Sequence, residues 1–147
     1  MIVLDTNVVA EPMKRSGDPA VRAWLDQQAA ETLYLTATSL SELLVGIEIL
    51  PSGKRKRGLG AALTELLDHL FGERILPFDR QAAAMYASLV ASARDRGHVI
   101  SVADAQIAAI SAVHGFTVAT RDTAPFKAAG VPIINPWESR PQYPKAR

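Results

Sequence analysis

The sequence predicts one α/β domain, a parallel sheet of four or five strands with helices on both faces. Short apolar runs alternate with longer stretches of helical periodicity along the chain. Strands that are separated by helices favour parallel pairing. The length of 147 residues suits a single domain, and 48% hydrophobic with 21% charged residues is typical of a globular protein.

The first strand is expected at residues 2–4, an apolar run that leads directly into Asp5-Thr6-Asn7. Taken alone, this tripeptide resembles a turn, because Asp and Asn side chains bond readily to nearby backbone. A helix is expected at 20–30, where Val21, Trp24 and Leu25 share helical spacing and Asp18-Pro19 supplies a cap and a first turn.

The later elements continue the alternation, with breakers such as Pro51-Ser52-Gly53 between them. We expect a strand at 33–36, a helix at 40–50 and, after the basic run at 54–57, a helical stretch to about residue 71. A short apolar segment at 75–78 and an Ala-rich helix at 81–94, capped by Asp79, are expected next. The last expected elements are a helix at 102–114, a strand at 117–120, a short helix at 123–129 and a strand at 131–135.

Charge and cysteine content narrow the class of protein. The net charge is +1, so the overall balance neither indicates nor excludes a nucleic-acid ligand. The chain has no cysteine, which excludes disulfides and thiolate metal sites. The simplest expected location for such a chain is the reducing cytoplasm. No secretory signal and no membrane-spanning run is expected from the sequence.

Four acidic residues stand beside element ends. Asp5 and Asp122 follow predicted strands, and Glu42 and Asp104 stand near helix starts. The carboxyl ends of parallel strands and the amino ends of the following helices share one edge, so the four acids can converge there. Crowded carboxylates repel one another, and Mg²⁺ or Mn²⁺ bound by their oxygens removes the penalty. Such a site suits phosphodiester hydrolysis.

A plainer interpretation exists for each acid taken singly. Ser39-x-x-Glu42 and Ser101-x-x-Asp104 both fit the Ser-x-x-acid pattern of a helix start, and Asp5 fits a turn. Only their combined placement favours a functional site.

Four motifs strengthen that interpretation: IVLDTNV, SLSELLVG, SVADAQIAA and TVATRD. In this order they resemble the PIN-domain ribonucleases, and in particular the toxin subunits of VapBC-type toxin–antitoxin pairs. RILPFD, VATRDT and the closing NPW are similar to the FitB branch. The resemblance extends to about Trp137. We therefore expect a PIN domain over 1–138 and a disordered tail over 139–147.

The resemblance implies roles for particular residues. Asp5, Glu42, Asp104 and Asp122 match the catalytic, metal-binding quartet of the family. Asp5 and Asp104 are expected to contact Mg²⁺ or Mn²⁺ directly, and Glu42 and Asp122 to act through water, hold a second metal or orient the nucleophile. Supporting hydrogen bonds are expected from Asn7, Thr120, Thr6 and Ser39, although purely local turn or cap bonds explain these four equally well.

Basic residues are the candidates for contact with substrate. Lys14 and Arg15, in the predicted loop after Asp5, are expected to meet RNA phosphates. Arg121, beside Asp122, is expected either to contact phosphate or simply to neutralise the acidic edge. The Lys54-Arg55-Lys56-Arg57 run is more simply a solvated loop.

The implied function is a metal-dependent endoribonuclease that acts as the toxin of a type II toxin–antitoxin pair and uses a metal-activated water. The implied partners are RNA, a small DNA-binding antitoxin, operator DNA through that antitoxin, and a second copy of the chain. The alternative is a binding subunit that stabilises the antitoxin on DNA with little nuclease activity. Receiver domains and haloacid-dehalogenase phosphatases fit poorly, because the first strand ends in Asp5-Thr6-Asn7.

Overall fold

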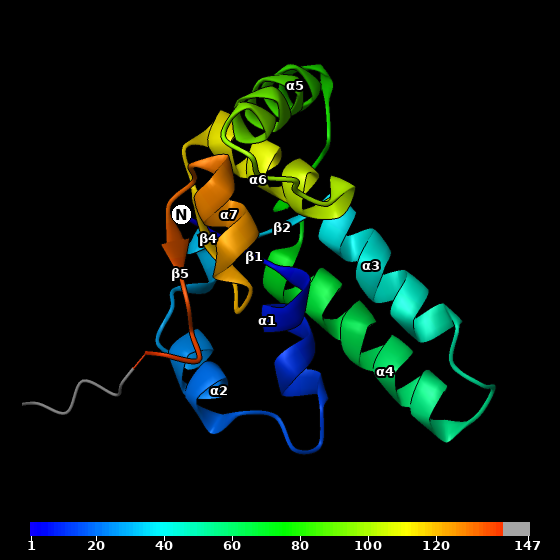
Figure 1. Ribbon diagram of the computed structural model, residues 1–147. Coiled ribbons are helices and arrows are strands. Elements are labelled where there is room, and N and C mark those ends of the chain that lie inside the picture. The colour runs from blue at the N-terminus through cyan, green and yellow to red at the C-terminus, as the bar shows by residue number, and fades with distance from the viewer. Residues whose placement is uncertain (140–147) are drawn as a thin grey trace, which may run out of the picture.

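The computed structural model describes residues 1–139, which form a five-stranded sheet of order β3-β2-β1-β4-β5 (Figure 1). All four strand pairings are parallel. The predicted α/β class and parallel sheet are therefore confirmed. The strands are Ile2–Leu4 (β1), Leu33–Thr36 (β2), Ile75–Leu76 (β3), Thr117–Ala119 (β4) and Ile133–Ile134 (β5).

The helices cover both faces of this sheet, as predicted (Figure 1). They are Thr6–Ala10 (α1), Pro19–Asp26 (α2), Ala37–Glu48 (α3), Lys54–Glu65 (α4), Arg80–Asp95 (α5), Val102–His114 (α6) and Thr123–Ala129 (α7). Short 3₁₀ turns span Glu11–Met13 and Ala30–Thr32, and a π-helical turn spans Leu66–Phe71.

The core has two halves because successive strand residues point to opposite faces of the sheet. Leu4 packs in a cluster with residues of α1 to α4, whereas Val3 packs in a second cluster with residues of α6 and α7. Both side chains are at most 1% exposed. Figure 1 shows the same division, with α5 to α7 together at one side and α1 to α4 at the other.

Some local expectations differ from the structure. The helix expected at 20–30 ends at Asp26, and Ala30 begins a separate 3₁₀ turn. Asp5-Thr6-Asn7 is not an isolated turn, because Asp5 is the N-cap of the short helix α1 and accepts a hydrogen bond from the Thr6 backbone. The helix expected at 40–50 begins at Ala37, because the Thr36 side chain accepts from the Ser39 backbone and acts as the cap. Ser39 therefore lies inside α3 and is not its cap.

The two basic clusters also lie in different surroundings from those expected. The run from Lys54 to Arg57 forms the first turn of α4, not a loop. Lys14 and Arg15 are separated from Asp5 by α1 and a 3₁₀ turn, not by a simple loop. No helix within residues 1–139 is both long and apolar enough to cross a bilayer. Apart from Ser139, the tail expected to be disordered lies outside the described residues.

Candidate active site

The candidate site lies where the strand order reverses. The chain passes from β1 outward through β2 and β3, and later returns to the other side of β1 as β4 and β5. Ligand sites of open parallel sheets lie at such a reversal, beyond the carboxyl ends of the strands. Asp5 stands at this point, and its backbone N–H donates to the Ala119 carbonyl of β4 at 2.9 Å.

Asp5 is the buried member of the site, with a residue exposure of 5%. Its carboxylate accepts hydrogen bonds from Thr120 Oγ1 at 2.8 Å, from the Thr6 backbone N–H at 2.8 Å and from Asn7 Nδ2 at 3.4 Å. Burial nevertheless raises the pKa of Asp5 from 3.8 to about 6, and the nearby charges of Asp104 and Glu42 contribute to the rise. The Thr120 and Thr6 bonds oppose it.

The other three acids surround Asp5 with increasing exposure. Asp104 is half-buried in the first turn of α6, where the Ser101 side chain caps the helix as expected. Burial raises the pKa of Asp104, and the charge of Asp122 adds to this. Glu42 is exposed on α3 and accepts from Thr6 Oγ1 at 2.9 Å. Asp122 is exposed, and its backbone donates to Thr120 Oγ1 at 3.0 Å.

The structure thus brings the four predicted acids into one electrostatically coupled cluster, which we call the carboxylate cluster. Within residues 1–139, however, no three Asp, Glu or His side chains are close enough to ligate one ion together. Mg²⁺ commonly takes one or two protein carboxylates and completes its shell with water and phosphate. The donor set, all carboxylate oxygen with a raised pKa at its centre, fits a hard divalent cation bound in this way.

Three of the four predicted supporting residues contact the acids directly. Thr6 bonds to both Asp5 and Glu42, and Asn7 and Thr120 bond to Asp5. Ser39 is different, since its hydroxyl is buried and has no hydrogen-bond partner among the described residues. Local cap bonds and contacts to the acids therefore coexist, because one oxygen of the Asp5 carboxylate caps α1 and the other accepts from Thr120.

Two of the predicted cationic residues, Lys14 and Arg121, lie at one rim of the cluster, because the charges of both act on Glu11 and Arg121 adjoins Asp122. The Lys14 ammonium pairs with the Glu11 carboxylate at 3.1 Å, and Arg15 is exposed. The Arg121 backbone N–H donates to Asn7 Oδ1 at 3.4 Å, and its guanidinium lies 5.3 Å from the centre of the Trp137 ring.

Sequence reasoning missed two residues of this rim, Glu11 and Trp137. Glu11 is 8% exposed, and its carboxylate also accepts from the Asp18 backbone at 2.9 Å. These bonds lower its pKa, and the charges of Lys14 and Arg121 contribute. An acid followed directly by proline was the only signal for Glu11, and the NPW motif was the signal for Trp137.

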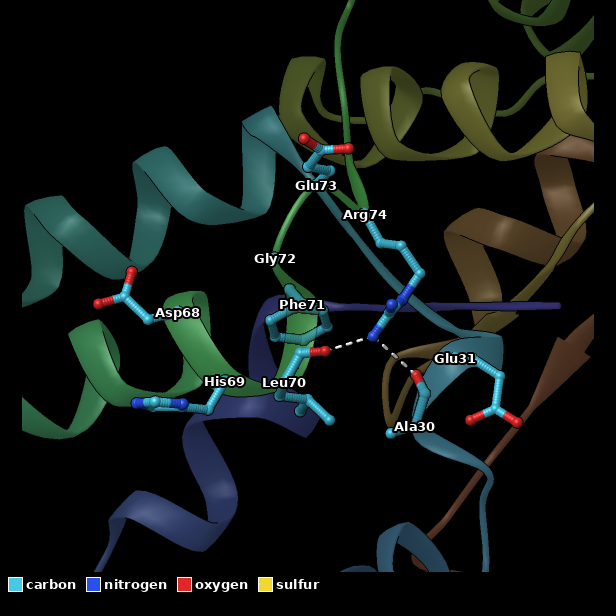
Figure 2. A pocket seen from close by; sticks show the side chains of 9 residues that line it. All are labelled: Ala30, Glu31, Asp68, His69, Leu70, Phe71, Gly72, Glu73 and Arg74. Carbon is cyan, nitrogen blue, oxygen red and sulfur yellow. Dashed lines mark hydrogen bonds between the residues drawn. The ribbon is translucent and has the colours of Figure 1, made fainter.

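Two open depressions lie away from the carboxylate cluster. One, of about 550 Å³, is at the amino end of β2. Figure 2 shows Arg74 reaching across it to the carbonyls of Ala30 and Leu70, and its Nε also donates to Leu33 at 3.0 Å. Arg74 therefore ties the π-helical turn to β2, which is a structural task. The other, of about 530 Å³, is an apolar groove between α3 and α4.

Comparison with known proteins places this arrangement in a family. The family model described as the PIN domain matches residues 2–131. The VapC ribonuclease Y4jK of Sinorhizobium fredii is 53% identical over 94% of this chain and 99% of its own. Toxin FitB of Neisseria gonorrhoeae is 45% identical over 93% of this chain and 99% of its own. The solved structure of FitAB bound to the IR36 DNA fragment has a TM-score of 0.86 and 41% identity, covering 97% and 100% of the two chains. The chain therefore belongs to the PIN-domain family, among the relatives of VapC and FitB toxins.

Proposed function

We propose that this chain is an endoribonuclease and the toxin of a toxin–antitoxin pair, with the carboxylate cluster as its active site. The observation that carries the proposal is the buried Asp5 carboxylate, which is kept beside Asp104 and Glu42 at an electrostatic cost. A protein that needed only a stable fold would gain from an apolar or amide side chain at this position. The names of the relatives, a VapC ribonuclease and toxin FitB, support the same activity.

Asp5 and Asp104 are the residues we expect to hold Mg²⁺ or Mn²⁺, with Glu42 and Asp122 acting through water. When bound at such a site, a divalent cation neutralises charge on the phosphate and lowers the pKa of a coordinated water. The raised pKa values of Asp5 and Asp104 mean that an added positive charge would favour their ionised forms.

The chain's own residues fix the orientation of the acids. Thr120 and the Thr6 backbone hold the two Asp5 oxygens from opposite sides, so the carboxylate cannot rotate freely. The Thr6 hydroxyl holds Glu42 toward the same point. Glu42 and Asp122 are exposed and face solvent, where an RNA phosphate and an attacking water can enter.

Cleavage of a mixed pool of structured RNAs by partner-free protein tests the proposal. We expect cutting in Mg²⁺ or Mn²⁺, none in EDTA, and products with 5′-phosphate and 3′-hydroxyl ends. Asp5→Asn should reduce the rate by at least about 10²-fold, a common loss when one transition-state-stabilising group is removed. Asp26→Asn, at an exposed position of α2, is the matched control. Equal rates for wild type and Asp5→Asn would refute the assignment.

We further propose that the chain assembles with a small DNA-binding antitoxin and reaches operator DNA through it. The similarity at 41% identity to FitAB bound to a DNA fragment supports this. An antitoxin arginine could supply positive charge to the carboxylate cluster in place of a metal ion. Co-purification with the product of an adjacent small gene tests the pairing, and the absence of any complex would count against it.

The binding-subunit alternative makes a separate prediction. If the chain acts mainly by stabilising the antitoxin on DNA, a variant with the carboxylate cluster substituted should, together with the antitoxin, shift operator DNA in a gel as well as wild type does. Wild type should then cut no RNA. The expected homodimer can be tested by sedimentation of the same preparations.

A further inference from the structure

The turn that follows β5 places an aromatic ring at the rim of the carboxylate cluster. Asn135 Oδ1 accepts from the Trp137 backbone at 3.0 Å, and the Asn135 carbonyl accepts from the Glu138 backbone at 3.1 Å. Pro136, between them, is buried. The turn carries Trp137 against the core cluster that contains residues of α1 and α2. Trp137 is thus held both by its backbone and by its packing.

Arg121 lies over this ring and is attached to the cluster by its backbone. The guanidinium carbon is 5.3 Å from the ring centre, within the range of a cation–π contact. The Arg121 N–H donates to Asn7 Oδ1, and Asn7 in turn donates to the Asp5 carboxylate. The adjacent Thr120 N–H donates to the Ile134 carbonyl at 2.9 Å. The same short stretch therefore carries Thr120, Asp122 and the stacked arginine.

The contact with the ring leaves the arginine able to bind an anion. A cation–π contact does not use the N–H donors of a guanidinium, which lie in its own plane. Within residues 1–139, Arg121 forms no ion pair with a carboxylate. Lys14, by contrast, already pairs with Glu11. A polyanionic strand that approaches four carboxylates is repelled unless a nearby cation offsets them.

We propose that Trp137 is a positioning residue that holds the Arg121 guanidinium ready to contact a phosphate of an RNA strand lying along the carboxylate cluster. The inference rests on the proposed ribonuclease function and gives the NPW motif a physical role. A long arginine side chain is flexible in solution, and pre-ordering it on a ring lowers the entropy lost when phosphate binds.

The test compares cleavage kinetics and RNA binding as a function of salt. Arg121→Ala and Trp137→Leu should each raise KM and the Kd for a labelled single-stranded RNA by about tenfold, with the smaller effect on kcat. The slope of log binding constant against log salt should fall by about 0.7, the value of one phosphate contact on a single strand. Trp137→Phe, which keeps an aromatic face, should restore most of both. Arg94→Ala, at an exposed position of α5, is the control for loss of one charge.

The double variant separates positioning from an independent role. If Trp137 acts through Arg121, Arg121→Ala combined with Trp137→Leu should bind RNA no more weakly than Arg121→Ala alone. Should Trp137→Leu unfold, Arg121→Ala and Trp137→Phe still test the inference, because both variants keep an aromatic ring at position 137: the first should weaken RNA binding and the second should largely preserve it.

The outcomes distinguish this inference from the proposed function. Normal cleavage by Arg121→Ala with an unchanged KM and salt slope overturns the inference and leaves the ribonuclease intact. Loss of antitoxin binding without any loss of RNA binding overturns it in favour of a partner contact. Wild-type protein that binds RNA with the expected Arg121 dependence but does not cut it supports the inference against the catalytic proposal. Wild-type protein that neither binds nor cuts RNA overturns both.

Discussion

Asp5 combines two tasks that oppose each other energetically. Its backbone and carboxylate begin α1 and connect β1 to β4, which requires it to be inside the protein. Burial removes its charge from water, and the charges of Asp104 and Glu42 lie nearby; both effects disfavour the ionised carboxylate. The hydrogen bonds from Thr6 and Thr120 stabilise the ionised carboxylate and offset part of this effect. The net result is a pKa of about 6 for Asp5.

Replacing Asp5 by Asn should therefore stabilise the metal-free protein, by an amount that depends on pH. The folded pKa of about 6 lies above the ordinary value of 3.8, so proton binding to Asp5 favours the folded state. That contribution is fully present below about pH 4 and is lost as pH rises through about 6. The shift corresponds to about 3 kcal/mol.

In EDTA, we expect the unfolding free energy of Asp5→Asn to exceed that of wild type most at pH 8, and the difference to shrink toward pH 4. Urea titrations at several pH values measure this. A difference that is the same from pH 4 to pH 8 would contradict the assigned pKa.

Thr120 offers a second test at the level of one side chain. Thr120→Val removes the donor to Asp5 Oδ2 at 2.8 Å but keeps the volume of this fully buried residue. Loss of a buried bond to a charged group should lower the unfolding free energy by about 1–3 kcal/mol at neutral pH, and the pKa of Asp5 should rise further. Thr120→Ser retains the hydroxyl and should preserve both values. Chemical denaturation and NMR titration of the Asp5 carboxyl group measure the two effects.

At the scale of elements, the segment between α1 and α2 is built around the buried Glu11 carboxylate. Its two oxygens receive the Asp18 backbone N–H and the Lys14 ammonium. Gly17 passes so close that an added Cβ would lie 2.4 Å from the Glu11 carbonyl oxygen. The segment is thus a tightly closed loop, and it sets where Lys14 and Arg15 stand.

Two glycine substitutions should have opposite effects on stability. Gly17→Ala introduces a clash with backbone, which cannot move as a flexible side chain can, and should lower the unfolding free energy by about 1–3 kcal/mol. Gly46→Ala, inside α3 and with nothing within 4 Å of the added Cβ, should raise it by about 0.5–1 kcal/mol. Thermal denaturation of both variants measures the effects, and equal shifts would show that the loop is less closed than described.

Helices and strands with clear local sequence signals could be predicted, whereas those without such signals could not. The helices at 102–114 and 123–129 were predicted at their observed bounds, because each ends at a glycine in the left-handed conformation. The strand at 33–36 was also predicted at its observed bounds, from its short apolar run. The short helix α1 could not be predicted, since its five residues are too few to show periodicity and its cap, Asp5, resembles a turn residue. The start of α3 was misplaced because Thr36 and Ser39 both fit a cap, and only the structure shows which one accepts the bond.

At the scale of the whole molecule, the fold brings four acids that are distant in sequence into one cluster. The strand order places β1 between β2 and β4, and this is why Asp5, Glu42 and Asp122 meet although they are distant in sequence. The four acids were predicted from element ends together with a family resemblance. The burial of Asp5, the closed loop around Glu11 and the contact between Arg121 and Trp137 depend on tertiary packing, which the short local signals at Glu11-Pro12 and in the NPW motif do not reveal.

A divalent cation that binds the cluster should stabilise the whole fold. Binding to the folded state alone adds about 2.7 kcal/mol when the ion is at 100 times its dissociation constant. We expect Mg²⁺ or Mn²⁺ to raise the melting temperature of wild type at pH 8 relative to EDTA. Asp104→Asn should reduce that rise, whereas Asp26→Asn should keep it. The same rise in the Asp104→Asn variant would mean that the ion binds elsewhere.

Hydrolysis of RNA at the carboxylate cluster can be tested by comparing the rate of RNA cleavage by Asp104→Asn with that of wild type. Both proteins should be purified without partner, shown to be folded by their melting temperatures, and assayed in Mg²⁺ and in EDTA, with Asp26→Asn as control. We expect wild type and Asp26→Asn to cut in Mg²⁺ only, and Asp104→Asn to be slower by at least about 10²-fold. Cutting by Asp104→Asn at the wild-type rate, or cutting that persists in EDTA, would contradict catalysis by the cluster.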